Sequence, residues 1–404
     1  MMKILSVNTR VARRLTRNGQ LLLLVKGACL LAILLCFLFK CSTSTKSDYS
    51  FEITPATSRV ERDGFDISSA RSLILDAPAQ SNHSSSCATL PDGRVVVLWY
   101  GGTREGAKDV CIYGKTAFPE DLSAAPTVAI CSREDVSRDL LRPVRKLGNP
   151  VVYSQGERLW MFVVSVSYGG WSGSSINYRY SDDKGKTWSK FRRLRTSPFF
   201  NLSALVRTPC VPRKDSGFIL PVYCEFITKY SMALFFDKAG RMTGRSRIPI
   251  DGNRESLQPS ITPISSNVAF AFSRTVSGKV GFAECLDGGI SWRARVSEEM
   301  ENHNASVATF CLSSGRVFLI GNSEADRSRL SLYESKTNLL SSAGEKDDVW
   351  KFVCDLENEQ GCEFSYPFLN QTANGSVYLT YTYKRRNIKF VDLSDCFYES
   401  NLQE

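Results

Sequence analysis

The stretch SDDKGKTW at Ser181–Trp188 recurs in altered form as CLDGGISW at Cys285–Trp292. In each copy an aspartate, a turn glycine, a threonine or serine and a tryptophan keep their offsets, and an apolar run typical of a strand precedes them. These residues predict a hairpin, because the carboxylate accepts hydrogen bonds from turn amides, the glycine adopts a left-handed backbone, and the tryptophan packs under the loop. The two tryptophans are 104 residues apart, or two units of about 52 residues, the length of one four-stranded propeller blade.

The repeat extends along most of the chain. Asn82–Gly101 and Asn302–Gly321 both begin with Asn-His, pass a glycine turn and continue into an apolar strand. The same order of strand, small-residue turn and apolar strand occurs in six units, which begin near residues 82, 147, 201, 257, 302 and 364. Six such units predict an all-β fold, a six-bladed β-propeller over residues 76–400. A two-sheet sandwich with many hairpins is the alternative, and the repeat favours the propeller.

The N-terminal region has the pattern of a membrane anchor. Residues 1–20 contain five basic residues and no acidic one, and residues 21–40 form an apolar segment interrupted by Lys26. This segment is long enough to cross a bilayer, and the basic flank predicts a cytosolic tail. We therefore expect a single-pass type II membrane protein of the secretory pathway, at the Golgi or cell surface, with a polar stem over residues 41–75. A cleaved signal peptide with its apolar core at 27–39 is the alternative and would give a secreted protein.

Cysteine usage also favours an exported protein. Three of the 13 cysteines lie in or beside the apolar segment and ten lie downstream, no two cysteines have CxxC spacing, and the chain has two histidines. This pattern predicts no metal site and no cofactor, and it suits disulfides in an oxidising compartment, with Cys354–Cys362 and Cys210–Cys224 as the expected local pairs. Five glycosylation sequons predict a glycoprotein. They begin at Asn82, Asn201, Asn304, Asn370 and Asn374.

The formal net charge of +10 arises partly from the N-terminal tail. No stripe of Lys and Arg and no aromatic RNA-binding motif accompanies the excess, so we expect no nucleic-acid partner. The remaining basic residues are compatible with an anionic ligand and with a solvated surface.

In a propeller the starts of the innermost strands line one mouth of the central channel, and sites there combine residues from several blades. His83 and His303 occupy equivalent positions in two predicted blade starts, and the loop at 101–109 is rich in glycine and charge. A ligand site at this mouth is one interpretation. The alternative is that the two histidines lie in capped polar turns and that the loop at 101–109 is the solvated end of a hairpin.

Several stretches of the chain carry a distinctive combined pattern. They are Asn82–Gly93, Tyr100–Gly106, Lys146–Pro150, Gly169–Ser174, Leu257–Ser260, Glu363–Pro367 and Tyr381–Arg385. Together they resemble the sialidase-like BNR-repeat family over roughly residues 80–393, and the Asp-Gly-Thr-Trp hairpins resemble its Asp-boxes. The resemblance implies a six-bladed propeller and exo-sialidase activity. Members with this activity use three arginines for the substrate carboxylate, a tyrosine nucleophile activated by a glutamate, and an aspartate as acid and base.

The resemblance assigns roles to individual residues. It implies that Tyr366 is the nucleophile and that Arg274 and Arg327 bind the substrate carboxylate, with Arg329 as the alternative to Arg327. It also implies that the acid and base lies in the first-blade loop, at Glu105 or Asp109.

Three positions depart from the family pattern. His83 stands where the first arginine belongs, Gln258 replaces the glutamate that activates the tyrosine, and Thr382 replaces a second glutamate. The pattern thus keeps two of the three arginines, unless Arg104 or Arg385 contributes another.

Other residues could complete such a site. Glu225 could supply a carboxylate and Arg207 further positive charge, or the two could form structural ion pairs. Trp171 could stack on a sugar ring or pack between blades.

The sequence therefore predicts an exo-acting glycosidase that releases a terminal acidic sugar, sialic acid or a related ulosonic acid, from an acidic glycan or glycoconjugate. In this mechanism Tyr366 or a water attacks the anomeric carbon, Glu105 or Asp109 donates the proton, and His83 assists the arginines. A non-catalytic carbohydrate-binding propeller is one alternative. Another is a lyase or an exo-arabinanase on the same fold, the lyase with His83 and Tyr366 as base and acid.

Overall fold

The structure is a computed structural model that describes residues 27–28, 31, 49–53, 59–196, 203–251, 255–295, 300–335, 339 and 350–399. The chain divides into two units, one with residues 1–46 and 195–201, the other with Ser47–Leu194 and Leu202–Glu404. All strands of the described residues lie in the second unit. The expected cytosolic tail and most of the expected anchor lie outside the described residues. Within those residues, no helix has the length and apolar character needed to cross a membrane.

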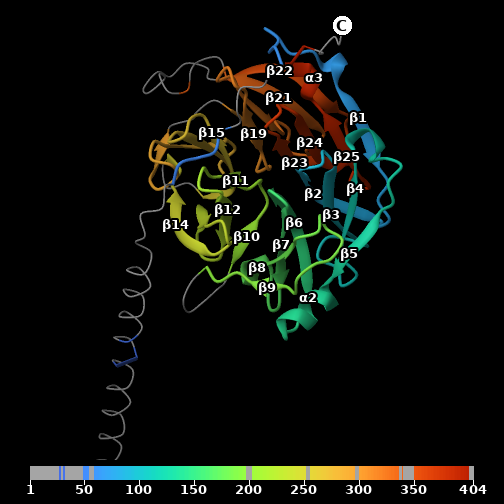
Figure 1. Cartoon of the computed structure of the whole chain (residues 1–404), viewed down its shortest axis with the longest axis vertical. Coiled ribbons are helices and arrows are strands. Elements are labelled where there is room, and N and C mark those ends of the chain that lie inside the picture. Colours follow the sequence, from blue (N-terminus) through green and yellow to red (C-terminus); the bar gives the residue numbers. More distant parts are fainter. Residues whose placement is uncertain are drawn as a thin grey trace, which may run out of the picture. The chain divides into compact units, whose positions relative to one another are not determined.

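In the described part of the chain the strands form six antiparallel sheets around a common centre (Figure 1). This confirms the six-bladed propeller and excludes the sandwich. From the inner strand outwards, blade 1 contains β2 (Ser81–Thr89), β3 (Val95–Gly102), β4 (Cys111–Ala117) and β5 (Val128–Ser132). Blade 2 contains β6 (Lys146–Gln155), β7 (Arg158–Val166), β8 (Ser174–Ser181) and β9 (Arg192–Arg193). Blade 3 contains β10 (Ala204–Val206), β12 (Phe218–Glu225), β13 (Lys229–Phe236) and β14 (Met242–Ile248), with β11 (Val211–Pro212) beside β12.

The second half of the propeller repeats this arrangement. Blade 4 contains β15 (Ser256–Pro263), β16 (Ala269–Thr275), β17 (Gly281–Cys285) and β18 (Trp292–Arg295). Blade 5 contains β19 (Ala308–Cys311), β20 (Val317–Gly321), β21 (Arg329–Ser335) and β22 (Trp350–Asn358). Blade 6 contains β23 (Phe364–Gln371), β24 (Val377–Tyr383), β25 (Asn387–Asp392) and β1 (Arg71–Leu75). Short helices lie outside the sheets: α2 (Arg133–Leu140), α3 (Ser394–Phe397) and the 3₁₀ turns η1 (Ile67–Ser69), η2 (Pro119–Asp121) and η3 (Trp171–Gly173).

The last blade is completed by the N-terminal strand. β1 pairs antiparallel with β25, with Arg71 opposite Asp392 and Leu75 opposite Ile388. An ion pair between the side chains of Arg71 and Asp392, 2.8 Å apart, supports this register. Residues 71–75, expected in the stem, are therefore part of the propeller and close its ring.

Other described residues of the expected stem also pack against the propeller. Phe51 is fully buried, and its amide donates to the carbonyl of Ser266 in blade 4. The guanidinium of Arg213 lies 4.8 Å from the ring centroid of Tyr49. Farther along, the carboxylate of Glu61 accepts a hydrogen bond from the amide of Ser314 in blade 5. The segment thus binds blades 3, 4 and 5 before it reaches β1.

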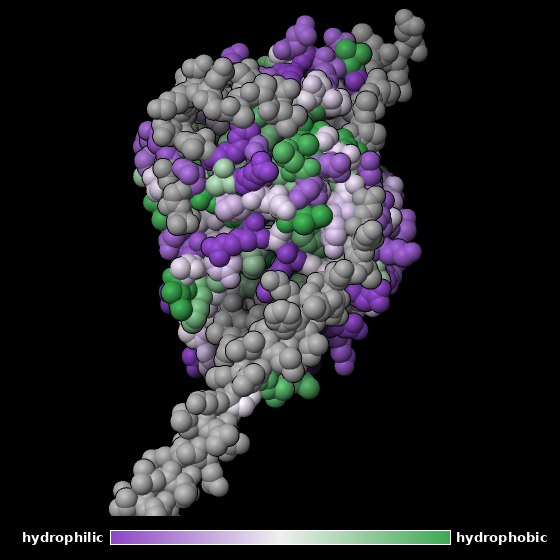
Figure 2. Space-filling view, turned by 90° about the vertical axis from the view of Figure 1, so that its left-hand side faces the viewer, coloured by the Kyte–Doolittle hydropathy of each residue, from purple (hydrophilic) through white to green (hydrophobic). Residues whose placement is uncertain are grey.

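The blades are stable because their central strands are buried on both faces. Every residue of β3 is buried, including Trp99, and β7 and β12 have the same continuous apolar character. Stacked sheets remove both faces from water, so these strands do not alternate between apolar and polar residues. Figure 2 shows a contrasting outer side, where hydrophilic residues separate small groups of hydrophobic ones.

The two hairpin motifs have the predicted local contacts. The Asp183 carboxylate accepts hydrogen bonds from the amide and hydroxyl of Thr187, at 2.8 and 2.6 Å, and these bonds lower the pKa of Asp183 to about 2. In the second copy the Asp287 carboxylate accepts from the amide of Ser291, at 2.8 Å. Gly185 has a φ of 89°, as a left-handed turn requires.

The cysteines of the described residues are all free thiols. The expected pairs Cys354–Cys362 and Cys210–Cys224 are therefore not formed in this structure. Burial raises the pKa of most of these thiols, as at Cys87, where it reaches about 12.

Arg207 divides the central channel. This buried side chain follows β10 in blade 3 and donates to the carbonyls of Ser85 in blade 1 and of Tyr366 and Pro367 in blade 6. On one side of Arg207 lie the starts of the inner strands. On the other side, their ends line a cavity of about 1300 Å³, together with Glu52 of the N-terminal segment.

Candidate functional site

The starts of the inner strands share an unusual backbone feature. One non-glycine residue in each blade has a left-handed backbone there, with φ between 42° and 58°. The six residues are Ser84, Asn149, Ser203, Gln258, Asn304 and Tyr366. In four blades this residue lies at a break in the strand register. Such conformations cost about 1–3 kcal/mol each and concentrate at functional sites. The six residues therefore indicate a functional site at this mouth.

The side chains of these residues form a chain of hydrogen bonds around the mouth. Ser84 Oγ donates to Asn149 Oδ1 at 3.1 Å, and Asn149 Nδ2 lies 3.3 Å from the hydroxyl of Tyr223. Gln258 Nε2 donates to the same hydroxyl, also at 3.3 Å. Gln258 Oε1 lies 3.5 Å from Nη1 of Arg274. This network fixes the left-handed side chains of three blades relative to one another.

Tyr366 lies among three guanidinium groups. Its hydroxyl is 3.5 Å from Nη1 of Arg274, and its ring centroid is 5.1 Å from Arg207 Cζ and 5.3 Å from Arg327 Cζ. The ring of His83 meets the Tyr366 ring edge to face, at 4.5 Å between centroids. The structure thus brings together Tyr366, Arg274 and Arg327, as the sequence analysis expects.

Asn304 holds two of these arginines. Arg274 Nε donates to Asn304 Oδ1 at 2.7 Å, and Arg327 Nη2 donates to the carbonyl of Asn304 at 3.2 Å. Arg329, the alternative to Arg327, instead pairs with Asp355 on β22 at 2.7 Å. The geometry therefore favours Arg327 as the second arginine of this group.

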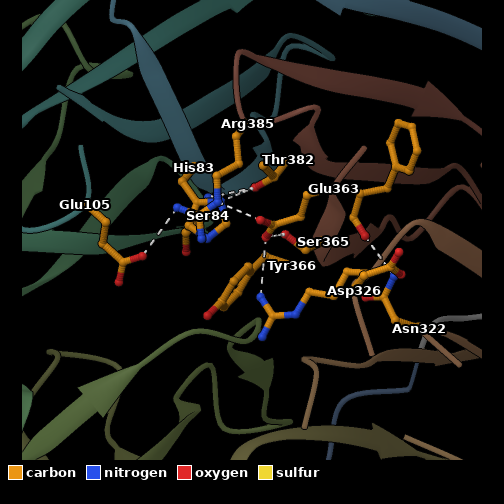
Figure 3. A network of polar contacts seen from close by, with 12 residues as sticks. His83, Ser84, Glu105, Asn322, Asp326, Glu363, Ser365, Tyr366, Thr382 and Arg385 are labelled. Atoms are coloured by element: carbon orange, nitrogen blue, oxygen red, sulfur yellow. Dashed lines mark hydrogen bonds and ion pairs between the residues drawn. The ribbon is translucent and has the colours of Figure 1, made fainter. Parts of the chain in front are cut away.

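Glu363 and Arg385 complete the charged part of the site (Figure 3). Arg385 Nε lies 2.6 Å from Glu363 Oε2, and Arg327 Nη1 lies 3.4 Å from Glu363 Oε1. Burial alone would raise the pKa of Glu363, but hydrogen bonds from Ser365 and Arg385 outweigh it and lower that pKa. Glu363 is thus a charged anchor for two arginines.

Sequence patterns assign Glu363 no role and indicate Arg385 only as a substitute for the missing arginine. Arg385 lies in the tight turn between β24 and β25, where it and Lys384 both have φ of 54°. Its carbonyl accepts from the amide of Asn82, which fixes the turn against β2. The position of Glu363 three residues before Tyr366 is the one sequence signal that could have indicated its role.

His83 is buried and neutral. Its Nδ1 lies 2.9 Å from the hydroxyl of Thr382 (Figure 3). Burial, and then the charges of Arg385, Arg327 and Arg207, lower the pKa of His83 well below its usual value. His83 therefore adds no positive charge to the mouth. His303, its equivalent in blade 5, is exposed, so the equivalence in sequence does not extend to the environment.

The first-blade loop places its two acidic candidates differently. The Asp109 carboxylate accepts from the amide and hydroxyl of Thr103, at 2.8 and 3.1 Å, and these bonds lower the pKa of Asp109. Asp109 is therefore ionised and closes its own loop, which disfavours it as a proton donor. Glu105 faces the site, with Oε2 3.6 Å from Arg385 Nη1. Arg104 is exposed, and none of the contacts around Tyr366 involves it.

Glu225 and Trp171 lie on the other side of the mouth. Burial is the main cause that raises the pKa of Glu225, against the opposing charges of Arg274 and Lys229. Among the described residues Glu225 forms no ion pair, so burial is not offset by a paired charge. The Trp171 ring covers the backbone at Gly148, where a Cβ would lie 3.1 Å from the indole. Trp171 is also partly exposed, so it packs against the propeller and keeps part of its side chain open to solvent.

Two sequons lie at this mouth, at Asn82 and Asn304. Asn82 is buried, and its Nδ2 donates to the carbonyls of Ala79 and Arg386, both at 2.7 Å. Both amide hydrogens are used, so a glycan on Asn82 is incompatible with this fold. Asn304 is exposed. The sequon at Asn201 lies outside the described residues.

Comparisons with known proteins agree with the architecture. Residues 93–379 match the family described as BNR repeat-like domain. No curated protein sequence matches the chain significantly. Among solved structures, the Hadza microbial sialidase Hz136 is 13% identical with a TM-score of 0.61, and the match covers 77% of this chain and 65% of that one. This chain therefore spans slightly less than two thirds of that sialidase.

Two further structures match over nearly their whole length. A protein of unknown function from Dyadobacter fermentans is 16% identical with a TM-score of 0.61, and the match covers 84% of this chain and 99% of that one. The intramolecular trans-sialidase from Ruminococcus gnavus, solved with oseltamivir carboxylate, is 14% identical with a TM-score of 0.61, covering 79% and 96%. At such identities the likeness establishes the fold alone.

Proposed function

Because the chain belongs to the BNR repeat-like domain family and has a sialidase-like propeller, we propose that it is an exo-acting glycoside hydrolase. Its substrate is a terminal acidic sugar, sialic acid or a related ulosonic acid, on a glycoconjugate. The observation that carries the proposal is the convergence of Arg274, Arg327 and Arg385 around Tyr366 and Glu363.

The arginines suit a sugar carboxylate on the anomeric carbon. A guanidinium presents paired N–H donors that match a carboxylate in geometry and charge. Arg274 and Arg327 are held by Asn304, and Arg327 and Arg385 by Glu363, so three donors are oriented before substrate binds. Preorganised donors need no reorganisation during the reaction. In this mechanism Arg385 supplies the charge that neutral His83 does not.

Bond cleavage requires an attacking oxygen and a proton donor. The phenol oxygen of Tyr366 or a water forms a bond to the anomeric carbon while the glycosidic C–O bond breaks and its electron pair goes to the leaving oxygen. Glu225, whose pKa is raised mainly by burial, gives that oxygen its proton in this mechanism. The attacking O–H releases its proton to solvent water, and after direct attack by water Glu225 is reprotonated from solvent. If Tyr366 attacks first, a water then displaces it as phenolate and gives a proton to Glu225, and the phenolate takes a proton from solvent. Glu105 is the alternative donor from the opposite side of the mouth.

One observation favours a second function, a carbohydrate-binding propeller without turnover. The carboxamide of Gln258 is engaged by Arg274 and Tyr223, so it neither carries charge nor acts as a base for Tyr366. A neutral phenol without a basic partner is a weak nucleophile at neutral pH.

The two functions are separated by assaying the full chain, produced in a secretory host. Aryl ketosides of sialic acid and of 3-deoxy-manno-octulosonic acid are incubated with wild type, Tyr366→Phe, Arg274→Ala and the control Arg329→Ala. Turnover that falls in the first two variants and persists in the control supports the glycosidase. Saturable binding without turnover, abolished by Arg274→Ala, would replace it with the binding function. Persistent turnover in Tyr366→Phe would assign the attack to water.

We also propose that the protein is a type II membrane protein of the secretory pathway. The basic residues 1–20 and the apolar residues 21–40 support this topology. In sealed microsomes the propeller should resist added protease, and the exposed sequon at Asn374 should carry a glycan that an endoglycosidase removes. A propeller that is digested without detergent and carries no glycan would overturn this assignment.

A further inference from the structure

Arg207 is a buried cation that lacks a carboxylate partner. It is 1% exposed, and its hydrogen bonds go to main-chain carbonyls, those of Ser85, Tyr366 and Pro367. Burial lowers the pKa of Arg207 to about 10, so the side chain is still a cation at neutral pH. Buried charges are normally paired with an opposite charge. Within the part of the chain that the structure describes, Arg207 forms no such pair.

Arg213 is a matched comparison in the same blade. It is also 1% exposed, but its Nη2 lies 2.8 Å from Asp215 Oδ2. Its guanidinium packs against the ring of Tyr49 in the N-terminal segment, away from the mouth. Arg213 thus has the carboxylate partner expected of a buried arginine that supports the fold, and Arg207 differs from it in this respect.

The acidic groups that act most strongly on the charge of Arg207 are three phenols and a thiol. They are those of Tyr366, Tyr223, Tyr100 and Cys87. Burial raises the pKa of Tyr223, Tyr100 and Cys87, so these three groups stay neutral. Tyr366 differs from them because it is partly exposed at the mouth. Of these four neighbours, Tyr366 is therefore the one whose side chain can become an anion opposite Arg207.

The contacts between Arg207 and Tyr366 suit this pairing. The guanidinium carbon of Arg207 lies 5.1 Å from the centroid of the Tyr366 ring. A phenolate spreads its negative charge over the ring, so a cation at this distance attracts it. Arg207 also donates to the carbonyls of Tyr366 and Pro367, where Tyr366 has a φ of 58°. One guanidinium thus holds the strained backbone of Tyr366 and places a positive charge against its ring.

We propose that Arg207 is a positioning residue that prepares Tyr366 for nucleophilic attack, by fixing its backbone and by stabilising its phenolate. The inference rests on the proposed function, because it concerns the attacking group of that reaction. It also supplies a means of activation that the carboxamide of Gln258 cannot provide, since a phenol attacks readily only as its anion.

The charge of Arg207 acts in both steps of the reaction. In the first, the phenol gives its proton to solvent water, its oxygen bonds to the anomeric carbon, and the leaving oxygen takes the proton of Glu225. In the second, the oxygen of a water bonds to the anomeric carbon, and the bond to Tyr366 breaks. The water proton goes to Glu225, and Tyr366 leaves as phenolate. Negative charge on the Tyr366 oxygen precedes the first step and follows the second, so Arg207 favours both.

Nitration with tetranitromethane tests the phenolate without any substrate, because this reagent attacks the anion of tyrosine. The full-length wild type, Arg207→Gln, Arg207→Lys and the control Arg213→Lys are nitrated, and peptide mass spectrometry measures the rate at Tyr366. Gln and Lys both keep N–H donors for the carbonyls, but Lys alone keeps the charge. Tyr168, which is 65% exposed, is the internal reference.

Wild-type Tyr366 should be nitrated at least as fast as the more exposed Tyr168. Nitration of Tyr366 should be about tenfold slower or more in Arg207→Gln, and close to wild type in Arg207→Lys and Arg213→Lys. A loosened fold would expose Tyr366 and speed up its nitration, so slower nitration separates the charge from a structural role. Equal nitration of Tyr366 in wild type and Arg207→Gln, or slower nitration of Tyr366 than of Tyr168 in wild type, would overturn the inference.

Turnover of an aryl ketoside by the same proteins separates this inference from the proposed function. In Arg207→Gln kcat should fall about tenfold or more while KM stays within about threefold, and Arg207→Lys should recover most of the loss. Equal losses of kcat in the two variants would leave Arg207 a structural role and overturn the inference while the hydrolase stands. If wild type hydrolyses nothing but the nitration difference is found, the hydrolase is wrong and the pairing of Arg207 with the Tyr366 phenolate stands.

Discussion

The two ends of the central channel use the same inner strands in different ways. At their starts six residues adopt left-handed backbones, and polar side chains link blade to blade around Tyr366. At their ends the strands pair regularly around a cavity of about 1300 Å³, and the N-terminal segment packs against them. The strained and charge-rich mouth indicates a functional role for that end of the channel. The apolar packing at the far face indicates a role in stability. Substitutions at the two ends should therefore change different quantities.

The largest effect should come from the far face. Phe51 is fully buried in a cluster with Val211, Ile219 and Phe235. Phe51→Ala should lower the free energy of unfolding by about 3–5 kcal/mol, because it leaves a cavity beneath blades 3 and 4. Thermal unfolding monitored by circular dichroism measures this change, with the exposed Phe118→Ala as control. Activity per folded molecule should stay at the wild-type level. An unchanged melting temperature would show that the N-terminal segment does not support the fold.

At the mouth the effect should fall on activity. Arg385→Gln removes one guanidinium from the group that Glu363 holds, and a hydrogen bond between charged groups contributes about 1.5–3 kcal/mol. We expect a loss of about 10- to 150-fold in kcat/KM for an acidic ketoside, mainly through KM. The neighbouring Arg386→Gln, on the same turn but exposed, is the matched control. Equal losses in the two variants would mean that the turn acts only through its net charge.

The two histidines offer a test of pH dependence. The pKa of buried His83 is lowered well below its usual value, whereas His303 is exposed. Below about pH 6.5 His83 is protonated in the unfolded chain but stays neutral in the folded protein. Above that pH His83 does not change the free energy of unfolding. As the pH falls below it, the free energy of unfolding decreases by about 1.4 kcal/mol per pH unit because of His83. Denaturant unfolding between about pH 6.5 and 5 should show a shallower slope in His83→Gln, and His303→Gln should match wild type.

The sequence predicted those parts of the fold that depend on local contacts. The hydrogen bonds of Asp183 and Asp287 lie within one turn, so the hairpins and the blade period were visible in the residues themselves. The closing pair of β1 and β25 joins residues more than 300 positions apart, such as Arg71 and Asp392. No local pattern marks that pairing, so the sequence analysis assigned β1 to a stem.

Prediction of the site from sequence is limited in the same way, because contacts between distant residues have no local pattern. Tyr366, Arg274 and Arg327 were found through the family resemblance, and the structure brings them together. Glu363 and Asn304 were not assigned, because their role is to orient arginines from other strands and turns. Asp109 was a candidate for its charge and its loop, but its nearest donors belong to its own turn.

Three blade starts did carry a readable signal. Asn149, Gln258 and Tyr366 each precede a proline, and each has a left-handed backbone at the mouth. The sequence analysis quoted these stretches only as family motifs. Compared as equivalent positions of the repeat, they indicate that one side chain from each of these blades faces the mouth.

The smallest predicted effect separates stability from activity within a single residue. Asn304 is exposed with φ of 55°, and its Oδ1 accepts from Arg274 Nε. In Asn304→Gly the left-handed backbone becomes unstrained, which should stabilise the fold by about 0.5–1 kcal/mol. Activity should nevertheless fall, by about tenfold, because Arg274 loses the partner that orients it.

Ser306→Ala provides the matched control for Asn304→Gly. It removes the same glycosylation sequon but keeps the Asn304 side chain, and the buried Ser306 hydroxyl has no partner among the described residues. The control should therefore keep wild-type activity and stability. If Asn304→Gly lowers both stability and activity, the left-handed backbone at the mouth is not a strained feature kept for function. The inference that the mouth serves function and the far face serves stability would then be wrong at Asn304, where one substitution tests both quantities.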